Sequence, residues 1–205
     1  MKLSYLFAAL GIVGALAASA QAAPVWTDWS STSAGTLSHA GHTTNVSLSG
    51  PVHSWDDGAP YYYQHPATFG GLNPTDMIRV AGTGTFTLTF DHAVTDFYMA
   101  LVSVGQPTLP VTYSFDQAFS VIADGPGSWG GGTYSISGND FTGSEFNGVL
   151  FFSGTFSSLT FSIDPSEYWH GFNIGVAEVP EPGSMALVGL SLALLGVATR
   201  RRTQR

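Results

Sequence analysis

Two glutamates are the residues of this chain that could act chemically on a polysaccharide. A glycoside hydrolase needs two carboxyl groups that face each other at roughly 5–10 Å, and Glu145 and Glu167 have side chains of the right type. Both lie in loop-like sequence, where acidic residues are more often solvated than catalytic. A secreted polysaccharide hydrolase that uses these loop carboxylates is therefore one hypothesis.

Three tryptophans could bind a saccharide rather than cleave it. Trp55, Trp129 and Trp169 lie in or beside loop-like sequence. Exposed aromatic rings can stack against the apolar faces of sugar rings, while a few polar groups fix the hydroxyls. Taken singly, each ring is more readily explained as part of a satellite core that caps an end of the sandwich. Taken together, the tryptophans keep a carbohydrate-binding function open.

Common catalytic motifs are missing from the sequence. It contains no Gly-x-Ser-x-Gly, no His-Glu-x-x-His, no cysteine nucleophile and no Gly-rich phosphate loop before a helix. The leading hypothesis is therefore a non-enzymatic surface or matrix protein that acts in adhesion or in the exopolysaccharide matrix of a biofilm.

Metal ligands are sparse. Asp56 and Asp57, followed by Gly58, could give oxygen ligands to Ca²⁺, but no Asp-x-Asp-x-Asp-Gly spacing is present and a plain acidic turn explains them too. His39 and His42 could hold a transition metal, although the sequence identifies no third ligand. No other cofactor is expected.

The charge of the central region excludes one class of partner. Residues 24–178 contain one basic residue, Arg79, and 13 acidic residues, which gives a formal net charge of −12. Nucleic acid needs a cationic surface that one arginine cannot provide. The chain also contains no cysteine, so packing must stabilise the fold without disulfides.

Alternating apolar and polar residues predict the elements that position these side chains. The alternation is clear in residues 85–90, 111–115, 159–163 and 172–176, and Gly-rich turns separate such stretches. Residues 94–104 are more continuously apolar, as in a central strand that is covered on both faces, and residues 149–152 are similar. We predict an all-β domain, an antiparallel β-sandwich of jelly-roll type.

Both ends of the chain predict targeting segments. Residues 1–22 combine Lys2, an apolar stretch and the small-x-small sequence Ala20-Gln21-Ala22, which is typical of a signal peptide whose helix is removed after export. Residues 184–199 form an uncharged apolar run that can just cross a bilayer as a transmembrane helix. The predicted β-sandwich ectodomain then spans residues 23–178, the size of one domain.

The C-terminal segment also contains a short motif. Pro180, Glu181 and Pro182 precede the apolar run, and the basic tail at residues 200–205 follows it. The tail contains Arg200, Arg201 and Arg202, a cluster that the positive-inside rule keeps in the cytoplasm. From physics alone, an ordinary membrane anchor after a Pro-rich linker would explain the same order.

The order of these parts over residues 179–205 resembles the PEP-CTERM sorting signal of bacterial exosortase substrates. The resemblance implies an exosortase as a partner and an inner-membrane anchor before processing. It further implies removal of the helix and delivery to the cell surface or extracellular matrix of a Gram-negative bacterium. It implies nothing about catalysis.

The strand region also resembles the ectodomain of a group of exosortase-dependent surface proteins of unassigned activity. The shared features are a strand at residues 86–90 that ends in Asp91, a partner strand at residues 94–104 and closing strands through Ile163 and Ile174. The group tends to have a Gly-Ser-x-Asp turn where this chain has Val102-Ser103-Val104-Gly105. This resemblance implies no catalytic residues.

Overall fold

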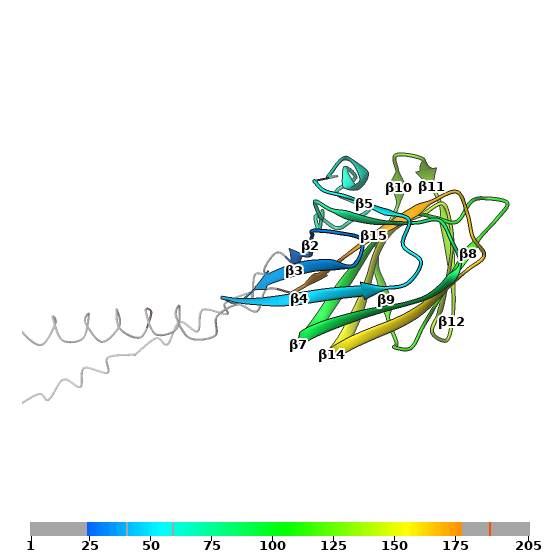
Figure 1. Ribbon diagram of the computed structural model, residues 1–205. Helices are drawn as coiled ribbons and strands as arrows, with labels where there is room; N and C mark the ends of the chain where they lie inside the picture. Colours follow the sequence, from blue (N-terminus) through cyan, green and yellow to red (C-terminus); the bar gives the residue numbers. More distant parts are fainter. Residues whose placement is uncertain (1–23, 40, 59, 178–188, 190–205) are drawn as a thin grey trace, which may run out of the picture.

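The computed structural model describes residues 24–39, 41–58, 60–177 and 189, and the described residues up to 177 form an antiparallel β domain (Figure 1). The elements within it are β1 (Val25–Trp26), β2 (Asp28–Trp29), β3 (Ala34–His39), β4 (His42–Ser49), β5 (Ser54–Asp56), the 3-10 helix η1 (Pro60–Tyr63), β6 (Met77–Val80), β7 (Gly84–Val104), β8 (Val111–Phe115), β9 (Ser120–Asp124), β10 (Pro126–Gly127), β11 (Gly130–Gly131), β12 (Thr133–Ser137), β13 (Asp140–Ser144), β14 (Phe146–Asp164) and β15 (His170–Val176). The all-β, antiparallel prediction is confirmed.

Two long strands, β7 and β14, form the frame of the domain. They pair with each other from Gly84 opposite Ile163 to Val104 opposite Phe146, and they lie side by side in Figure 1. The sequence predicted two shorter strands within each of them, because polar residues and Gly154 interrupt the apolar pattern. The structure instead shows shifts of register at these places, since β-bulges bend a strand without ending it.

The remaining strands extend this frame on both sides. The main sheet runs in the order β12-β13-β8-β14-β7-β15-β6-β5, and the β3–β4 hairpin pairs with the first half of β7 through β4. Figure 1 shows the N-terminal strands at one end of the domain and β8 at the other. The finer assignment to the jelly-roll type stays a prediction.

The second half of β7 is buried on both faces, as its apolar sequence predicted. Phe97, Met99 and Leu101 belong to the main hydrophobic core. The alternate residues, among them Tyr98 and Ala100, belong to a second core on the opposite face of the sheet. This second core includes Tyr62, Tyr63 and Phe69 from the long connection between β5 and β6, so that connection covers the sheet.

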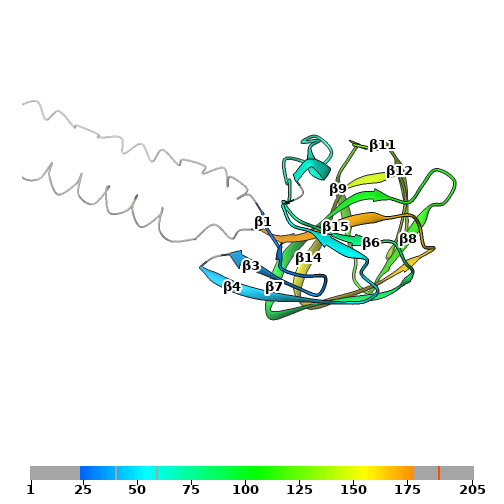
Figure 2. The ribbon, with the colours of Figure 1, turned by 45° about the horizontal axis from the view of Figure 1, so that its top comes forward.

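The first and last strands of the domain lie beside each other. Val25 of β1 pairs with Val176 of β15, and Figure 2 shows the two strands together. The predicted signal helix and the predicted transmembrane helix lie outside the described residues. Within the described part of the chain, no helix is both long and apolar enough to cross a membrane.

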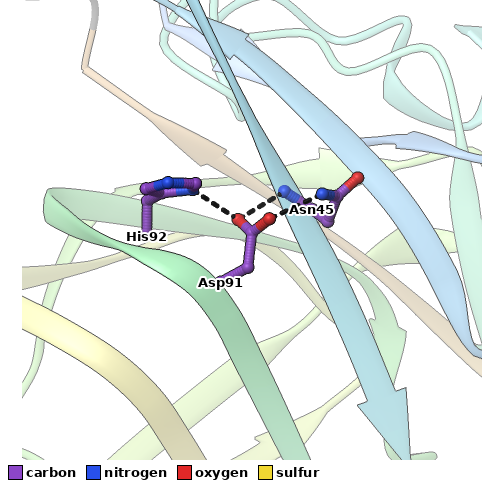
Figure 3. Close-up of polar contacts among 3 residues, drawn as sticks. All are labelled: Asn45, Asp91 and His92. Atoms are coloured by element: carbon purple, nitrogen blue, oxygen red, sulfur yellow. Dashed lines mark hydrogen bonds and ion pairs between the residues drawn. The ribbon is translucent and has the colours of Figure 1, made fainter.

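A polar contact ties β4 to the bend of β7 (Figure 3). Asp91 accepts hydrogen bonds from the Asn45 backbone amide at 2.8 Å and from the Asn45 side chain at 2.5 Å. His92 Nδ1 lies 2.9 Å from the same carboxylate. The Asn45 hydrogen bond, with help from His92, lowers the pKa of Asp91 because both interactions favour the ionised form.

Candidate functional site

A pocket of about 280 Å³ lies where several strand ends meet. Its lining residues are Ser103, Gln106, Trp129, Glu145, Glu167, Tyr168 and Trp169. They come from the end of β7 and the turn after it, the β10–β11 turn, the residue directly before β14 and the loop before β15. The pocket therefore brings together the two glutamates and two of the three tryptophans that the sequence singled out.

Glu145 is held by the end of β7. Its Oε2 accepts a hydrogen bond of 3.0 Å from Ser103 Oγ. Both residues have a positive φ, 55° for Ser103 and 54° for Glu145, which is unfavourable for residues with a Cβ. Asn147 is buried between them, since it accepts from the Ser103 amide at 3.0 Å and donates to the Glu145 carbonyl at 3.0 Å. Strained backbone of this kind collects at ligand sites.

Glu167 is buried more deeply than Glu145. Its side chain is 1% exposed, and its Oε1 accepts from the Gly105 amide at 2.8 Å and lies 2.6 Å from His170 Nδ1. Its Oε2 has no hydrogen-bond partner among the residues that the structure describes. The Tyr113 ring packs against His170, and burial together with the charge of Glu167 raises the pKa of Tyr113.

Gly105 joins the two glutamates. Its N–H donates to the Glu167 carboxylate, and its carbonyl accepts from the Glu145 amide at 3.0 Å. Gly105 has a φ of 76°, and a Cβ added there would collide with the Gly143 carbonyl oxygen. Only glycine fits this position, so a short turn of backbone fixes the two acidic residues relative to each other.

Three aromatic rings form one wall beside the acids. Trp129 and Trp169 meet edge to face with ring centroids 4.9 Å apart, and Tyr62 stacks on Trp129 at 5.4 Å. Burial and a hydrogen bond with Tyr61 raise the pKa of Tyr62, so this ring stays neutral. Trp129 remains 47% exposed, so part of this residue is accessible to a ligand.

Arg79 lies behind this wall. Its guanidinium is 5.1 Å from the centre of the Trp169 ring and 3.6 Å from Asp56. This arginine is the only Lys or Arg of residues 24–178, and it does not line the pocket. The acids of the pocket therefore have no lysine or arginine among the lining residues to balance them.

The other residues that the sequence singled out lie elsewhere. Trp55 is outside the pocket lining, and its Nε1 donates to the Trp29 carbonyl at 2.9 Å. Asp56 pairs with Arg79 and Asp57 is exposed. In the described ranges, no group of three or more His, Asp or Glu side chains could hold a metal ion. The sorting residues Pro180, Glu181 and Pro182 and the cluster Arg200, Arg201 and Arg202 fall outside the described residues.

A second pocket lies beside the β3–β4 hairpin. It has a volume of about 330 Å³, and His39, His42 and His92 contribute to its lining. His39 and His42 are opposite each other in the register of the hairpin. Nδ1 of His39 is buried and has no hydrogen-bond partner among the described residues.

Ser103 and Gln106 are pocket residues that the sequence analysis did not single out. Ser103 interrupts the apolar stretch of residues 94–104, and a polar residue in a strand that is covered on both faces is a signal that could have found it. Gln106 lies in the turn with Gly105 and Pro107, which appeared to be only a connection.

The comparisons with known proteins concern the C-terminal segment. Residues 178–202 match the PEP-CTERM protein-sorting motif. No curated protein and no solved structure matches the chain. The chain thus carries the signal for exosortase-dependent sorting, in which an exported, membrane-anchored precursor is processed for display at the cell surface.

Proposed function

We propose that this exosortase substrate binds extracellular polysaccharide through the pocket of Glu145, Glu167 and Trp129. It would act without catalysis, in adhesion or in the organisation of the matrix around a Gram-negative cell. The observation that supports this proposal is the meeting of two carboxylates and an exposed aromatic wall in one pocket. A few oriented polar groups beside an apolar surface are what a sugar-binding site requires.

The pocket has the groups that a sugar unit needs. The apolar face of a sugar ring can pack against the exposed part of Trp129, while its hydroxyls donate to a carboxylate. Glu145 Oε1 has no hydrogen-bond partner among the described residues and is available for this role, whereas the side chain of Glu167 is only 1% exposed. A volume of about 280 Å³ suits one unit of a longer chain rather than an extended segment.

The position of the pocket also supports the proposal. The motif begins directly after β15, whose last residue, Val176, pairs with Val25. The pocket residues lie next to the first residue of β15, His170. Six steps of about 3.3 Å place the two ends of this strand roughly 20 Å apart. The pocket therefore lies away from the end of the domain that carries the sorting segment.

A secreted hydrolase is the second candidate, because Glu145 and Glu167 line one pocket. Binding without catalysis is favoured because each carboxylate already has contacts within the protein. Glu167 is 1% exposed, and its Oε1 is held by the Gly105 amide and His170. Glu145 is held by Ser103. A catalytic acid or base must instead reach the glycosidic oxygen or a water molecule.

A retention assay tests both candidates. The full-length chain, purified in a mild detergent, is passed over immobilised polysaccharides, and both retention and release of reducing sugar are measured. We expect saturable retention without sugar release. Trp129→Ala should reduce the affinity about tenfold, because one stacked ring contributes roughly 1.5 kcal/mol.

Trp55→Ala is the matched control, since Trp55 has a similar exposure, 38% against 47% for Trp129, but lies outside the pocket lining. Its retention should equal that of the unmodified chain once circular dichroism shows that both variants are folded. Release of reducing sugar that Glu145→Gln abolishes would favour the hydrolase. Absence of retention on every polysaccharide would contradict the binding proposal.

A further inference from the structure

The pocket combines negative charge with aromatic rings in a way that a neutral sugar does not require. Glu145 and Glu167 contribute two carboxylates, and the described lining contains no lysine, arginine or histidine. A neutral sugar would need only hydrogen-bond acceptors, which amides and hydroxyls provide without the cost of desolvating a charge. The negative charge of the pocket therefore favours a ligand that carries a positive charge.

We propose that the pocket selects a sugar unit that bears a free ammonium group, as in a polymer of amino sugars that is not acetylated. This inference rests on the proposed function and narrows its ligand to a cationic class. The ammonium would contact the exposed part of Trp129 and pair with Glu145. A polymer of uronic acids would be repelled.

The geometry of Glu145 supports its role as the partner of a cation. Ser103 Oγ, a neutral donor, holds Oε2 at 3.0 Å, and Oε1 has no hydrogen-bond partner in the described part of the chain. Glu167, in contrast, already lies 2.6 Å from His170. A partly enclosed carboxylate without a cationic partner gains more from an added positive charge than an acid on the open surface does.

The aromatic wall supports the same class of ligand. The face of an indole ring attracts cations, most strongly where water is excluded. The only Lys or Arg of residues 24–178, Arg79, already lies 5.1 Å from the centre of the Trp169 ring. Trp169 thus binds a cation of the protein itself. Trp129, whose ring centroid is 4.9 Å from that of Trp169, is 47% exposed and accessible to a second one.

Non-specific electrostatic attraction of a cationic polymer to the acidic domain is the alternative explanation, and the experiment must distinguish it from binding in the pocket. With a net charge of −12 over residues 24–178, the domain would attract any cationic chain weakly. Asp140 provides the matched control, because it is exposed, lies at the other end of β13 from Glu145 and has no side-chain hydrogen bond within the described residues. Asp140→Asn removes the same charge as Glu145→Gln without changing the pocket.

The test measures binding of two hexamers to the full-length chain in detergent, at one pH and one salt concentration. One probe is a hexamer of β-1,4-linked glucosamine and the other is its fully N-acetylated form. We expect the glucosamine hexamer to bind at least about tenfold more tightly, as for a cation that pairs with a carboxylate and a ring. Glu145→Gln should remove most of this preference, and Asp140→Asn should leave it unchanged.

Three results would overturn the proposal. Equal binding of the two hexamers would reject the selection of an ammonium group but leave the proposed polysaccharide function standing. Equal weakening by Glu145→Gln and Asp140→Asn would assign the preference to non-specific electrostatic attraction. Binding of neither hexamer, together with no retention on any polysaccharide, would reject the proposed function as well.

Discussion

Ser103 and Glu145 are joined by a 3.0 Å hydrogen bond, and both residues have a left-handed backbone conformation. Ser103 is at the end of β7, and Glu145 directly precedes β14, the partner of β7. The bond therefore links the two long strands of the domain at the place where the pocket opens. Neither conformation is favoured by residues with a Cβ, so the surrounding contacts must impose both.

Substitution of Ser103 separates backbone strain from the loss of the hydroxyl. Ser103→Ala and Ser103→Gly both remove the hydrogen bond to Glu145, but glycine tolerates a positive φ. We expect Ser103→Gly to be more stable than Ser103→Ala by about 1 kcal/mol in urea unfolding. Both should bind saccharide equally weakly, because both lose the group that orients Glu145. Equal stability of the two variants would argue against strain at this residue.

Gly105→Ala should damage both the fold and the pocket. An added Cβ meets a left-handed φ and the Gly143 carbonyl oxygen, so we expect a loss of about 2–4 kcal/mol in the free energy of unfolding. Gly138→Ala is the control, since Gly138 has a similar φ of 62° but no atom lies within 4 Å of a Cβ added there. It should cost only about 1 kcal/mol and leave saccharide binding intact. A Gly105→Ala variant as stable as Gly138→Ala would contradict this account.

Asp76 should be a strong determinant of stability. It is 2% exposed, and its two carboxylate oxygens accept from the Trp29 amide at 2.8 Å and the Gly58 amide at 3.0 Å. Asp76→Ala leaves both N–H groups without this acceptor, so we expect a loss of about 3 kcal/mol, measured by urea unfolding. Asp57→Ala, an exposed acid in the same loop, should change stability by less than about 0.5 kcal/mol. Similar costs for the two variants would show that Asp76 does not hold this loop.

The contact of Asp91 with Asn45 predicts a dependence of stability on pH. The pKa of Asp91 is lower in the folded chain than its ordinary value of 3.8, so the ionised carboxylate stabilises the fold above that pH. This contribution is lost as the pH falls from about 4 through the lowered pKa. Thermal melting of the unmodified chain and of Asp91→Asn should therefore differ at pH 7 and converge in acid. A difference that stays constant below pH 4 would contradict this assignment.

The sorting motif predicts cleavage of the C-terminal segment. Intact mass of the protein from its native host should lack residues 185–205, because exosortase processing removes the segment that follows the motif. Replacement of Pro180, Glu181 and Pro182 by alanine should leave the precursor uncut. A full-length C-terminus in the mature protein would contradict this expectation.

The sequence predicted the fold class because alternation reports directly on burial. Phe86, Leu88 and Phe90 alternate with threonines, and all three are buried in the core. The length of β7 and β14 could not be predicted, because a bulge and a turn use the same polar and glycine residues. The β12–β13 hairpin was missed although it carries a signal: residues 133–137 alternate, and Gly138 and Asn139 form a two-residue connection.

The candidate site was predicted by residue type and not by position. Glu145, Glu167, Trp129 and Trp169 were chosen for their chemistry, yet nothing in the sequence pairs them. Their meeting depends on which strands are neighbours, and that order is set by contacts between distant parts of the chain. Trp55 had the same sequence features as Trp129, but its indole N–H is used within the fold.

Amide hydrogen exchange with and without the glucosamine hexamer tests the central claim, that the pocket of Glu145, Glu167 and Trp129 is the ligand site. The account predicts slower exchange confined to residues 103–106, 127–131, 143–147 and 166–170. Residues 39–44 and 91–93, beside the histidine-lined pocket, should not change. Unchanged exchange at the first set at a saturating concentration of the hexamer, or protection only at the second, would contradict the claim.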